Sequence, residues 1–453
     1  MLMFNDLQAI ATVDSANAFS RRLDDTYNGV ARLHRMGLSL PPELRDLETV
    51  INWPRLVVDS LEERLDVEGF RMTGRDQGDD RLWSWWQANR LDEESSLGHI
   101  EAFVQGSAAV FVGANEEDPT TPLITVEALN GVRVFINQRT GNVEWAVRLY
   151  EWDDNGSPVR AAVYRVGYTR YYVALNGVGW KLESEVFHDL PIVPVVPLIN
   201  RPRLSDRSGR SEMADVIPIT EAACRTLSNL QGAQEMLAVP QRYVLGADES
   251  DFEDADGNKK STWEAYMGRI WALGNNEAKI GQLSGADLRN FTEVINHYAR
   301  IVSAISGLPP HFLGLSTDNP PSADAIRSSE SRLVKRALRR SRSFGETWEQ
   351  VMRLSLLVVD GKLPDEAHRM ETMWADPGTP TFSAKADAVV KLMGAKDSQG
   401  RSLLPREAAW EELGYSVEKR RRLMAMESED PAVRFLAATG ASFDDTVPLT
   451  DGA

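Results

Sequence analysis

The spacing of apolar residues changes along the chain and predicts segments of different secondary structure. Through residue 105 they recur at helical intervals, as at Leu56, Leu61 and Leu65, so residues 1–105 are predicted to be mainly helical. From Ser107 onward the period changes, and turn signals such as Asn130-Gly131 separate short runs of β-branched and aromatic residues. Seven such runs predict an antiparallel β subdomain, and they span residues 109–112, 123–129, 132–136, 143–152, 161–166, 171–175 and 180–187.

After the β subdomain, the chain is predicted to cross into a mainly helical region. Prolines punctuate residues 190–202, which indicates a crossing segment and a domain boundary. A first helix is predicted over residues 212–237, before Pro240. A small β hairpin is predicted to follow, with strands at 241–245 and 269–273.

A second helix follows the hairpin and has clear end signals. Ser284 and Asp287 resemble an N-terminal capping box, and Gly307 followed by prolines predicts the end of this helix. The loop that follows, residues 308–321, is rich in Pro, Gly, Ser and Asn.

A long helix is predicted from Ser322, as its cap, to Asp360, with Gly361 beyond it. Its length would be roughly 58 Å at about 1.5 Å per residue. Placing residues at about 100° intervals gathers Ile326, Leu333, Ala337, Phe344, Trp348, Val351 and Ser355 on one side. The opposite side carries Arg332, Lys335, Arg336, Arg339, Arg340 and Arg342. We do not expect such a helix to be fully buried in its own monomer.

The remainder of the chain is predicted to return to the β layer and then to be helical. Residues 372–374 are the predicted returning strand, and residues 384–428 are helical with interruptions at Leu403–Pro405 and Gly414. The acidic tail from Thr439 is predicted to be mobile.

Composition indicates a folded protein that is acidic except for one segment. The 453 residues are 42% hydrophobic and 26% charged, and 50 Lys and Arg against 67 Asp and Glu give a net charge of −17. This balance disfavours a generic DNA-coating module, because Lys and Arg supply most non-specific affinity for phosphates. In Asp324–Arg342, however, seven basic residues stand against two acidic ones, a local charge of +5. A run of this kind is as often a solvated helix face as a binding surface.

The same sequence predicts neither a membrane span nor a secretion signal. Its longest apolar runs are far shorter than the ~20 residues that a span needs, and residues 1–10 contain Asp6 and no basic residue. Cys224, the single cysteine, excludes an intrachain disulfide and suits a reducing compartment. We therefore expect the protein in a cytosol or in a particle assembled there.

No catalytic, metal or cofactor motif emerges. The six histidines lack the i, i+4 spacing of a helical zinc site, and residues 394–402 have the wrong spacing for a phosphate loop. The acidic residues Asp248–Asp256 are read as a solvated hairpin tip rather than a calcium loop. Cys224 is read as a helix-packing residue, and the tryptophans at 83, 85 and 86 as either buried packing or an interface belt.

Several segments together resemble the portal proteins of tailed double-stranded DNA bacteriophages, in the group related to long-tailed phages. The strongest match is Ser306–Gly314 followed by Pro320–Arg327 and the basic helix to Trp348. Further matches are Asn52–Asp59, Pro194–Pro202 and Pro240–Tyr243.

The resemblance implies an α+β portal fold with named parts. These would be a wing of helices and antiparallel sheet (1–211), stem helix 1 (212–238), a β-hairpin clip (239–283), stem helix 2 (284–307), a tunnel loop (308–321), a long basic helix with a return to the wing (322–383), a helical crown (384–430) and a flexible tail (431–453).

The resemblance also implies a function and partners. Such proteins form a ring, usually of twelve subunits, at one capsid vertex, through which DNA enters and leaves. The implied partners are other copies of the chain, non-specifically threaded double-stranded DNA, terminase, a head-tail adaptor, and the major capsid and scaffolding proteins. The implied location is the virion, and the host cytoplasm during assembly.

The resemblance assigns roles to three sets of residues. The tunnel-loop set, toward DNA, is His311, Leu315, Ser316, Thr317, Asp318 and Asn319. The basic-helix set, toward DNA or a neighbouring subunit, is Arg332, Lys335, Arg336, Arg339, Arg340 and Arg342. The clip set, toward terminase or adaptor, is Gln241, Arg242, Tyr243, Trp263, Tyr266 and Arg269.

Two other functions stay open at this level. One is a monomeric nucleic-acid-binding protein that uses the basic helix. The other is a hydrolase acting through carboxylates of the β subdomain, although no pair of the 67 acidic residues is spaced to suggest one.

Overall fold

The computed structural model describes twelve stretches of the chain, and its contacts divide the chain into two units. The first unit is Met1–Asp24, Arg55–Ala214 and Asn319–Ala453, and the second is Asp25–Pro54 and Asp215–Asp318. The described residues are 6–15, 17–31, 49–73, 78–175, 179–237, 242–245, 279–282, 288–315, 322–378, 382–396, 399–415 and 417–428.

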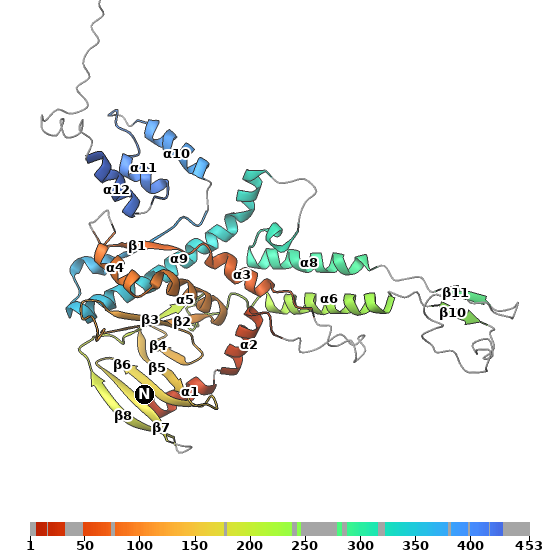
Figure 1. Cartoon of the computed structure of the whole chain (residues 1–453), viewed down its shortest axis with the longest axis horizontal. Helices are drawn as coiled ribbons and strands as arrows, with labels where there is room; N and C mark the ends of the chain where they lie inside the picture. The colour runs from red at the N-terminus through yellow and green to blue at the C-terminus, as the bar shows by residue number, and fades with distance from the viewer. Residues whose placement is uncertain are drawn as a thin grey trace, which may run out of the picture. The chain divides into compact units, whose positions relative to one another are not determined.

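A five-stranded antiparallel sheet in the order β4-β5-β6-β7-β8 lies in the first unit (Figure 1). Helix α1 (Asp6–Ser15) covers one face of it, because Ile10 and Val13 pack against the inward side chains of Trp145 and Val147. Its strands are β4 (Val132–Ile136), β5 (Val143–Trp152), β6 (Pro158–Arg165), β7 (Tyr168–Leu175) and β8 (Gly179–Phe187).

One buried carboxylate attaches α1 to this sheet. Asp6 accepts hydrogen bonds from Arg165 (2.8 Å), Arg170 (3.1 Å) and the Tyr172 hydroxyl (2.9 Å). Burial opposes ionisation of Asp6, but these donors hold its pKa below the usual range. The carboxylate therefore stays charged and paired near neutral pH.

A second sheet, in the order β3-β2-β9, contains a strand that the sequence pattern did not predict. Strand β9 (Val195–Ile199) lies in the proline-rich stretch that was predicted to be a crossing segment, so part of that stretch is a paired strand instead. The division between the two units falls after this stretch, between Ala214 and Asp215. Pro197 is tolerated because β9 is an edge strand of this sheet. The other strands are β2 (Ser107–Gly113) and β3 (Leu123–Glu127), so the seven predicted strands are present but belong to two sheets.

The strand that returns to the β layer was predicted correctly, but it pairs with a strand that the sequence did not suggest. Strand β12 (Glu371–Trp374) pairs with β1 (Val67–Arg71), which lies within the part predicted to be mainly helical. The two form a sheet of their own, apart from the two larger ones. The sequence therefore located the returning strand but not its partner.

The core of the first unit is an aromatic cluster around one histidine. His99 is fully buried, its ring stacks on Phe344 at 5.1 Å, and its Nε2 accepts a hydrogen bond from Trp348 Nε1 at 3.0 Å. Trp348 in turn meets Trp86 edge to face at 5.0 Å, and Trp85 and Trp86 are buried. For Trp85 and Trp86 the structure supports the reading as buried packing, whereas Trp83 is half-buried. Burial lowers the pKa of His99 to about 3, so its imidazole is neutral.

Among the helices of the first unit, α4, α5 and α9 contribute side chains to this cluster. Helices α5 and α9 pack against β2 and β9, and α9 also packs against β12. Their bounds are α4 (Asp80–Ala88), α5 (Leu91–Gln105), α9 (Ala323–Asp360), the 3₁₀ turn η4 (Asp365–Arg369), α10 (Phe382–Gly394), α11 (Arg406–Glu412) and α12 (Val417–Ser428). Helix α3 (Trp53–Glu62) and helix α2 (Asn17–Tyr27) each cross from one unit to the other.

The second unit contains two helices, α6 (Ile217–Leu237) and α8 (Arg289–Ser306), that run side by side (Figure 1). Helix α6 begins five residues later than predicted, with Pro218 in its first turn, where a proline is tolerated. Helix α8 begins at Arg289, and the predicted capping box at 284–287 lies outside the described residues. Gly307 ends α8 with φ 76°, as predicted.

Cys224 of α6 is buried, as a packing residue would be, and its Sγ accepts a hydrogen bond from the Ile51 amide at 3.2 Å. The α+β class is confirmed. In the stretches that the structure describes, no helix is long and apolar enough to cross a membrane.

We predict that His99 makes the protein acid-sensitive. Its pKa in the folded chain is about 3, below the usual value of about 6.5. The stabilisation by the neutral ring is therefore complete above about pH 6.5 and is lost as the pH falls toward 3, by up to about 1.4 kcal/mol per pH unit. Urea unfolding between pH 7 and pH 4 measures this slope.

The matched variants are His99→Gln, which keeps an acceptor for Trp348, and His368→Gln at an exposed position. His99→Gln should flatten the acid limb of the stability curve, and His368→Gln should leave it as it is. An equally steep acid limb in both variants would mean that another group carries the effect.

Candidate functional site

Helix α9 has both of its predicted ends. The Ser322 hydroxyl accepts a hydrogen bond from the Ala325 amide at 3.2 Å, and Gly361 closes the helix with φ 68°. The predicted apolar side is buried along most of its length, since Leu333, Phe344 and Trp348 are at most 1% exposed. Ile326, near the start, is 36% exposed and departs from this pattern.

The basic side of α9 divides into two groups. Four of the six predicted residues are exposed: Arg332, Lys335, Arg339 and Arg342. The side chains of Arg336 and Arg340 are only 21% and 13% exposed. The sequence pattern treated all six alike, whereas the fold turns two of them inward.

Glu212 is the reason for this inward orientation. Its side chain is fully buried, and its two carboxylate oxygens accept from Arg336 and from Arg340 (3.2 Å). Asn200 Nδ2 donates to the second oxygen at 3.0 Å, and the Glu212 amide bonds to the Phe103 carbonyl. Burial, with the charge of Arg340, lowers the pKa of Arg336 to about 10, so it stays protonated at neutral pH. The carboxylate therefore joins α9 to the chain after β9 by charge-assisted hydrogen bonds.

A serine hydroxyl of α8 holds the start of the segment that follows this helix. Ser303 Oγ donates to the Leu308 carbonyl at 2.7 Å, and residues Pro310–Leu313 form the 3₁₀ turn η3. Within the tunnel-loop set, His311 is exposed with its ring edge-on to Phe312, and Leu315 is half-buried. The remaining members, at 316–319, lie outside the described residues.

Strand β10 (Arg242–Leu245) contains two members of the clip set. Arg242 pairs with Gln282 and Tyr243 with Gly281 of β11 (Lys279–Gln282). The predicted partner strand at 269–273 lies outside the described residues, as do Gln241, Trp263, Tyr266 and Arg269 and the acidic stretch 248–256. The structure thus describes a hairpin pairing in this region, through a strand that the sequence did not suggest.

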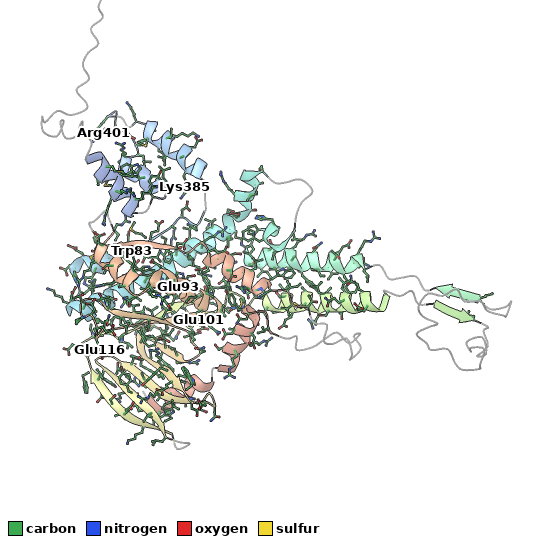
Figure 2. All side chains as sticks on the ribbon, viewed as in Figure 1. Trp83, Glu93, Glu101, Glu116, Lys385 and Arg401 are labelled. Atoms are coloured by element: carbon green, nitrogen blue, oxygen red, sulfur yellow. The ribbon has the colours of Figure 1, made fainter. Side chains whose placement is uncertain are left out.

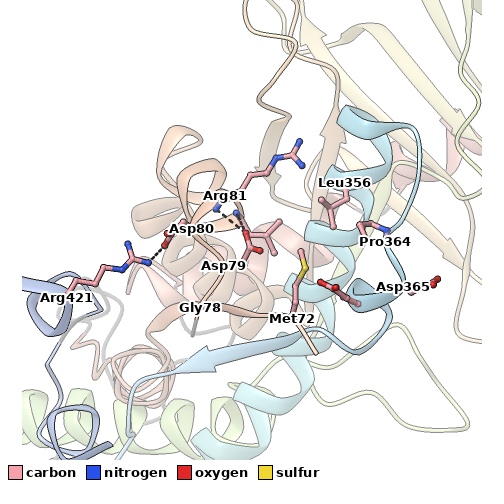
Figure 3. Close-up of a pocket in the computed structure, with 11 residues that line it drawn as sticks. Met72, Gly78, Asp79, Asp80, Arg81, Leu356, Pro364, Asp365 and Arg421 are labelled. Atoms are coloured by element: carbon pink, nitrogen blue, oxygen red, sulfur yellow. Dashed lines mark hydrogen bonds and ion pairs between the residues drawn. The ribbon is translucent and has the colours of Figure 1, made fainter. Parts of the chain in front are cut away.

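A hollow of about 1030 Å³ lies beside the start of α4 (Figure 3). Two of the acidic side chains in its lining, Asp79 and Asp80, have structural partners. Asp79 caps α4 through the amides of Arg81 and Leu82, Arg81 holds Asp360 at 2.7 Å, and Arg421 of α12 bonds Asp80. Asp79, Asp80, Arg81 and Arg421 of the lining therefore act as a helix cap and in ion pairs.

Two carboxyl groups elsewhere have strongly raised pKa values with structural causes. Burial, reinforced by the charge of Asp24, raises the pKa of Glu101 to about 7 (labelled in Figure 2). Burial raises the pKa of Glu349 to about 6, and its carboxylate accepts from the Thr372 amide and from Arg353. No group of three or more His, Cys, Asp or Glu side chains within the described stretches could hold a metal ion.

Sequence reasoning missed Glu212 and the arginines that follow β9. The signal was visible, because residues 201–210 contain Arg201, Arg203, Arg207 and Arg210 against one aspartate. The proline pattern drew attention to a boundary instead. A charge count over this segment would have revealed a second basic region.

We predict that Glu212→Gln destabilises the protein by about 3–5 kcal/mol, because it leaves two largely buried guanidiniums without their counter-charge. The free energy of unfolding in urea measures the loss. Glu371→Gln is the matched control, since Glu371 pairs with Arg71 at 2.7 Å but is 67% exposed. Glu371→Gln should lower the free energy of unfolding by at most about 1 kcal/mol. Equal losses in the two variants would contradict a special role for Glu212.

Comparison with known proteins identifies the family. The family model described as phage portal protein, SPP1 Gp6-like, matches residues 20–412. The portal protein of Mycobacterium phage L5 is 38% identical over 440 residues, which cover 93% of this chain and 88% of that protein. The portal protein of Mycobacterium phage D29 is 37% identical over 453 residues, which cover 97% of this chain and 92% of that protein. This chain therefore belongs to the phage portal protein family, whose members are structural proteins that form rings in phage capsids rather than enzymes.

Proposed function

We propose that this chain is a subunit of a twelve-membered portal ring at one capsid vertex, forming the channel through which DNA is packaged and ejected. The observation that carries the proposal is the family match over residues 20–412, a range that includes α6, α8 and α9. In the virion the ring would also be the platform for terminase during packaging and for the head-tail adaptor afterwards. Scaffolding and major capsid proteins would surround it during assembly in the host cytoplasm.

The parts of the fold have proposed roles within such a ring. Residues 1–211 and 322–383 would form the wing, α6 and α8 the stem, residues 239–283 the clip, and residues 384–430 the crown. Residues 308–321, with His311 and Leu315 to Asn319, would form the tunnel loop that approaches DNA. Gln241, Arg242, Tyr243, Trp263, Tyr266 and Arg269 would be the docking residues of the clip.

Two physical properties of the chain support a ring that threads DNA. At −17 per subunit, a ring is strongly acidic and repels phosphates, so DNA can slide without adhering. Apolar side chains of α8 are left uncovered, since Val294 and Ile305 are each 42% exposed. A cyclic assembly covers such surfaces through heterologous contacts that close by rotation.

A second candidate function is a monomeric nucleic-acid-binding protein. The exposed positions of Arg332, Lys335, Arg339 and Arg342 favour it. This candidate differs from the first in its assembly state and in the salt dependence of its DNA binding. The affinity of a monomer that binds DNA through these residues would fall steeply as the salt concentration rises.

We predict that the purified protein forms closed rings. Twelve copies of the 50.5 kDa chain give about 600 kDa, which native mass measurement resolves, and negative-stain images should show a central hole. A stable 50.5 kDa monomer that binds DNA tightly at low salt would contradict the proposal and favour the second candidate. Co-expression with scaffolding protein tests whether a monomer only lacks its assembly partner.

A further inference from the structure

A hollow of about 450 Å³ lies along strand β4, at one edge of the five-stranded sheet. All of β4 (Val132–Ile136) lines it, together with residues of α5, β2 and β9 and the turn at 208–209. Among the described lining residues, Arg133 is the one that carries a charge. The hollow is therefore a largely uncharged groove that follows the edge of a strand.

The main chain of β4 has hydrogen-bonding groups on the side away from β5. The Leu149 amide donates to the Gly131 carbonyl at 2.7 Å, so these two opposite residues form a hydrogen-bonded pair. Bonded and non-bonded pairs alternate along an antiparallel ladder, so Arg133 bonds to β5 and Val134, opposite Ala146, does not. The N–H and C=O of Val134 therefore point outward, where an added strand could pair with them.

A buried hydroxyl in the same groove also lacks a partner. Ser20 lines the groove and is 9% exposed, and its Oγ makes no hydrogen bond within the described part of the chain. Since buried polar groups in folded proteins are nearly always hydrogen-bonded, such a group indicates a missing partner. An extended main chain in the groove would offer this hydroxyl both amide and carbonyl groups.

The opposite edge of the same sheet is the exposed strand β8 (Figure 1). Seven of its nine residues are exposed, and they include Leu182 (45%), Val186 (50%) and Phe187 (74%). The His188 amide donates to the Gly167 carbonyl at 2.9 Å, so by the same alternation the N–H and C=O of Phe187 point away from β7. An exposed apolar edge strand of this kind is a template for pairing with another chain.

The apolar side chains of the two edges match on both faces of the sheet. On β4, Phe135 packs toward α1, and Val134 packs toward the second sheet. On β8, Leu182 is opposite Tyr172, which lies on the α1 face, and Val186 lies on the other face. A strand β8 laid beside β4 would therefore continue the apolar surface of each face.

We propose that strand β8 of a second copy of this chain pairs with the outer edge of β4, so that the sheet continues from one subunit to the next. The proposal rests on the proposed function, because a ring needs two different complementary surfaces on each subunit, and this sheet supplies both. Five antiparallel strands leave β4 and β8 running in the same direction, so a head-to-tail contact pairs them in parallel. A contact of β8 with another β8 would instead close a dimer and leave the groove along β4 uncovered.

The test is cysteine crosslinking in the full-length protein, whose own Cys224 is buried. The variant carries Arg133→Cys and Leu182→Cys, at exposed positions on the same face of the two edge strands. Within one subunit these positions are four strand spacings apart, about 19 Å, so a short bismaleimide joins them only between subunits. We expect a ladder of crosslinked species on a denaturing gel, extending to the size of the ring measured by native mass.

The controls are the two single variants and a matched double variant. The matched variant combines Arg133→Cys with Glu93→Cys, at a 67% exposed position of α5. None of the three should give a ladder. Dimers from Leu182→Cys alone would overturn the proposal, because β8 would then meet a second β8. An equally strong ladder in the Glu93 variant would also overturn it, because crosslinking would not depend on the position of β8.

Native mass separates failure of this proposal from failure of the proposed function. Rings that give no ladder in the Arg133/Leu182 variant would overturn the pairing of β8 with β4 and leave the ring in place. A protein that stays monomeric, with or without scaffolding protein, would overturn both.

Discussion

Burial of one face of α9 is the constraint on which the first unit depends. Phe344, Trp348 and Val351 of this helix are fully buried, and they contact side chains from α4 and α5 as well as the neighbouring strands. The Trp348 to His99 hydrogen bond satisfies the indole N–H of Trp348 and one of the two ring nitrogens of His99 inside this aromatic cluster. Because nearly all other surroundings are apolar, the imidazole must be neutral, and the cluster excludes water from the centre of the unit.

Placing α9 in this way determines where its charges go. A helix with one buried face presents the opposite face to solvent, and residues at its flanks lie at the boundary. Arg336 and Arg340 are at that boundary and are stabilised only because Glu212 meets them there. Removing a carboxylate from such a place is far more damaging than removing an exposed one, since the guanidiniums would be left largely buried without a counter-charge.

The charge distribution suits a protein through which DNA passes. A chain with a net charge of −17 repels the duplex over most of its surface, while the arginines of α9 and of residues 201–210 concentrate positive charge in one region. Members of this family form rings. The acidic net charge is consistent with weak adhesion of DNA to such a ring.

Local signals in the sequence were enough to determine individual elements. Ser322 and Gly361 predicted the ends of α9 correctly, because caps depend on the hydrogen bonds and φ angles of a few neighbouring residues. The seven strand segments and the end of α8 at Gly307 follow from equally local turn and cap chemistry. The resemblance carried by Ser306–Gly314 and the segments around it was likewise sufficient to identify the family.

Relations between distant segments were decided only by tertiary structure. The sequence did not reveal that β12 pairs with β1, or that Pro197 lies in an edge strand, since strand pairing depends on backbone hydrogen bonds between remote residues. It also treated the six basic residues of α9 as one face. Glu212, more than a hundred residues earlier, turns two of them inward, because a buried carboxylate and a guanidinium must meet in space to compensate their desolvation. Helical periodicity gives the direction in which each side chain points around the helix axis. Only the packed chain determines which charged group lies opposite that side chain.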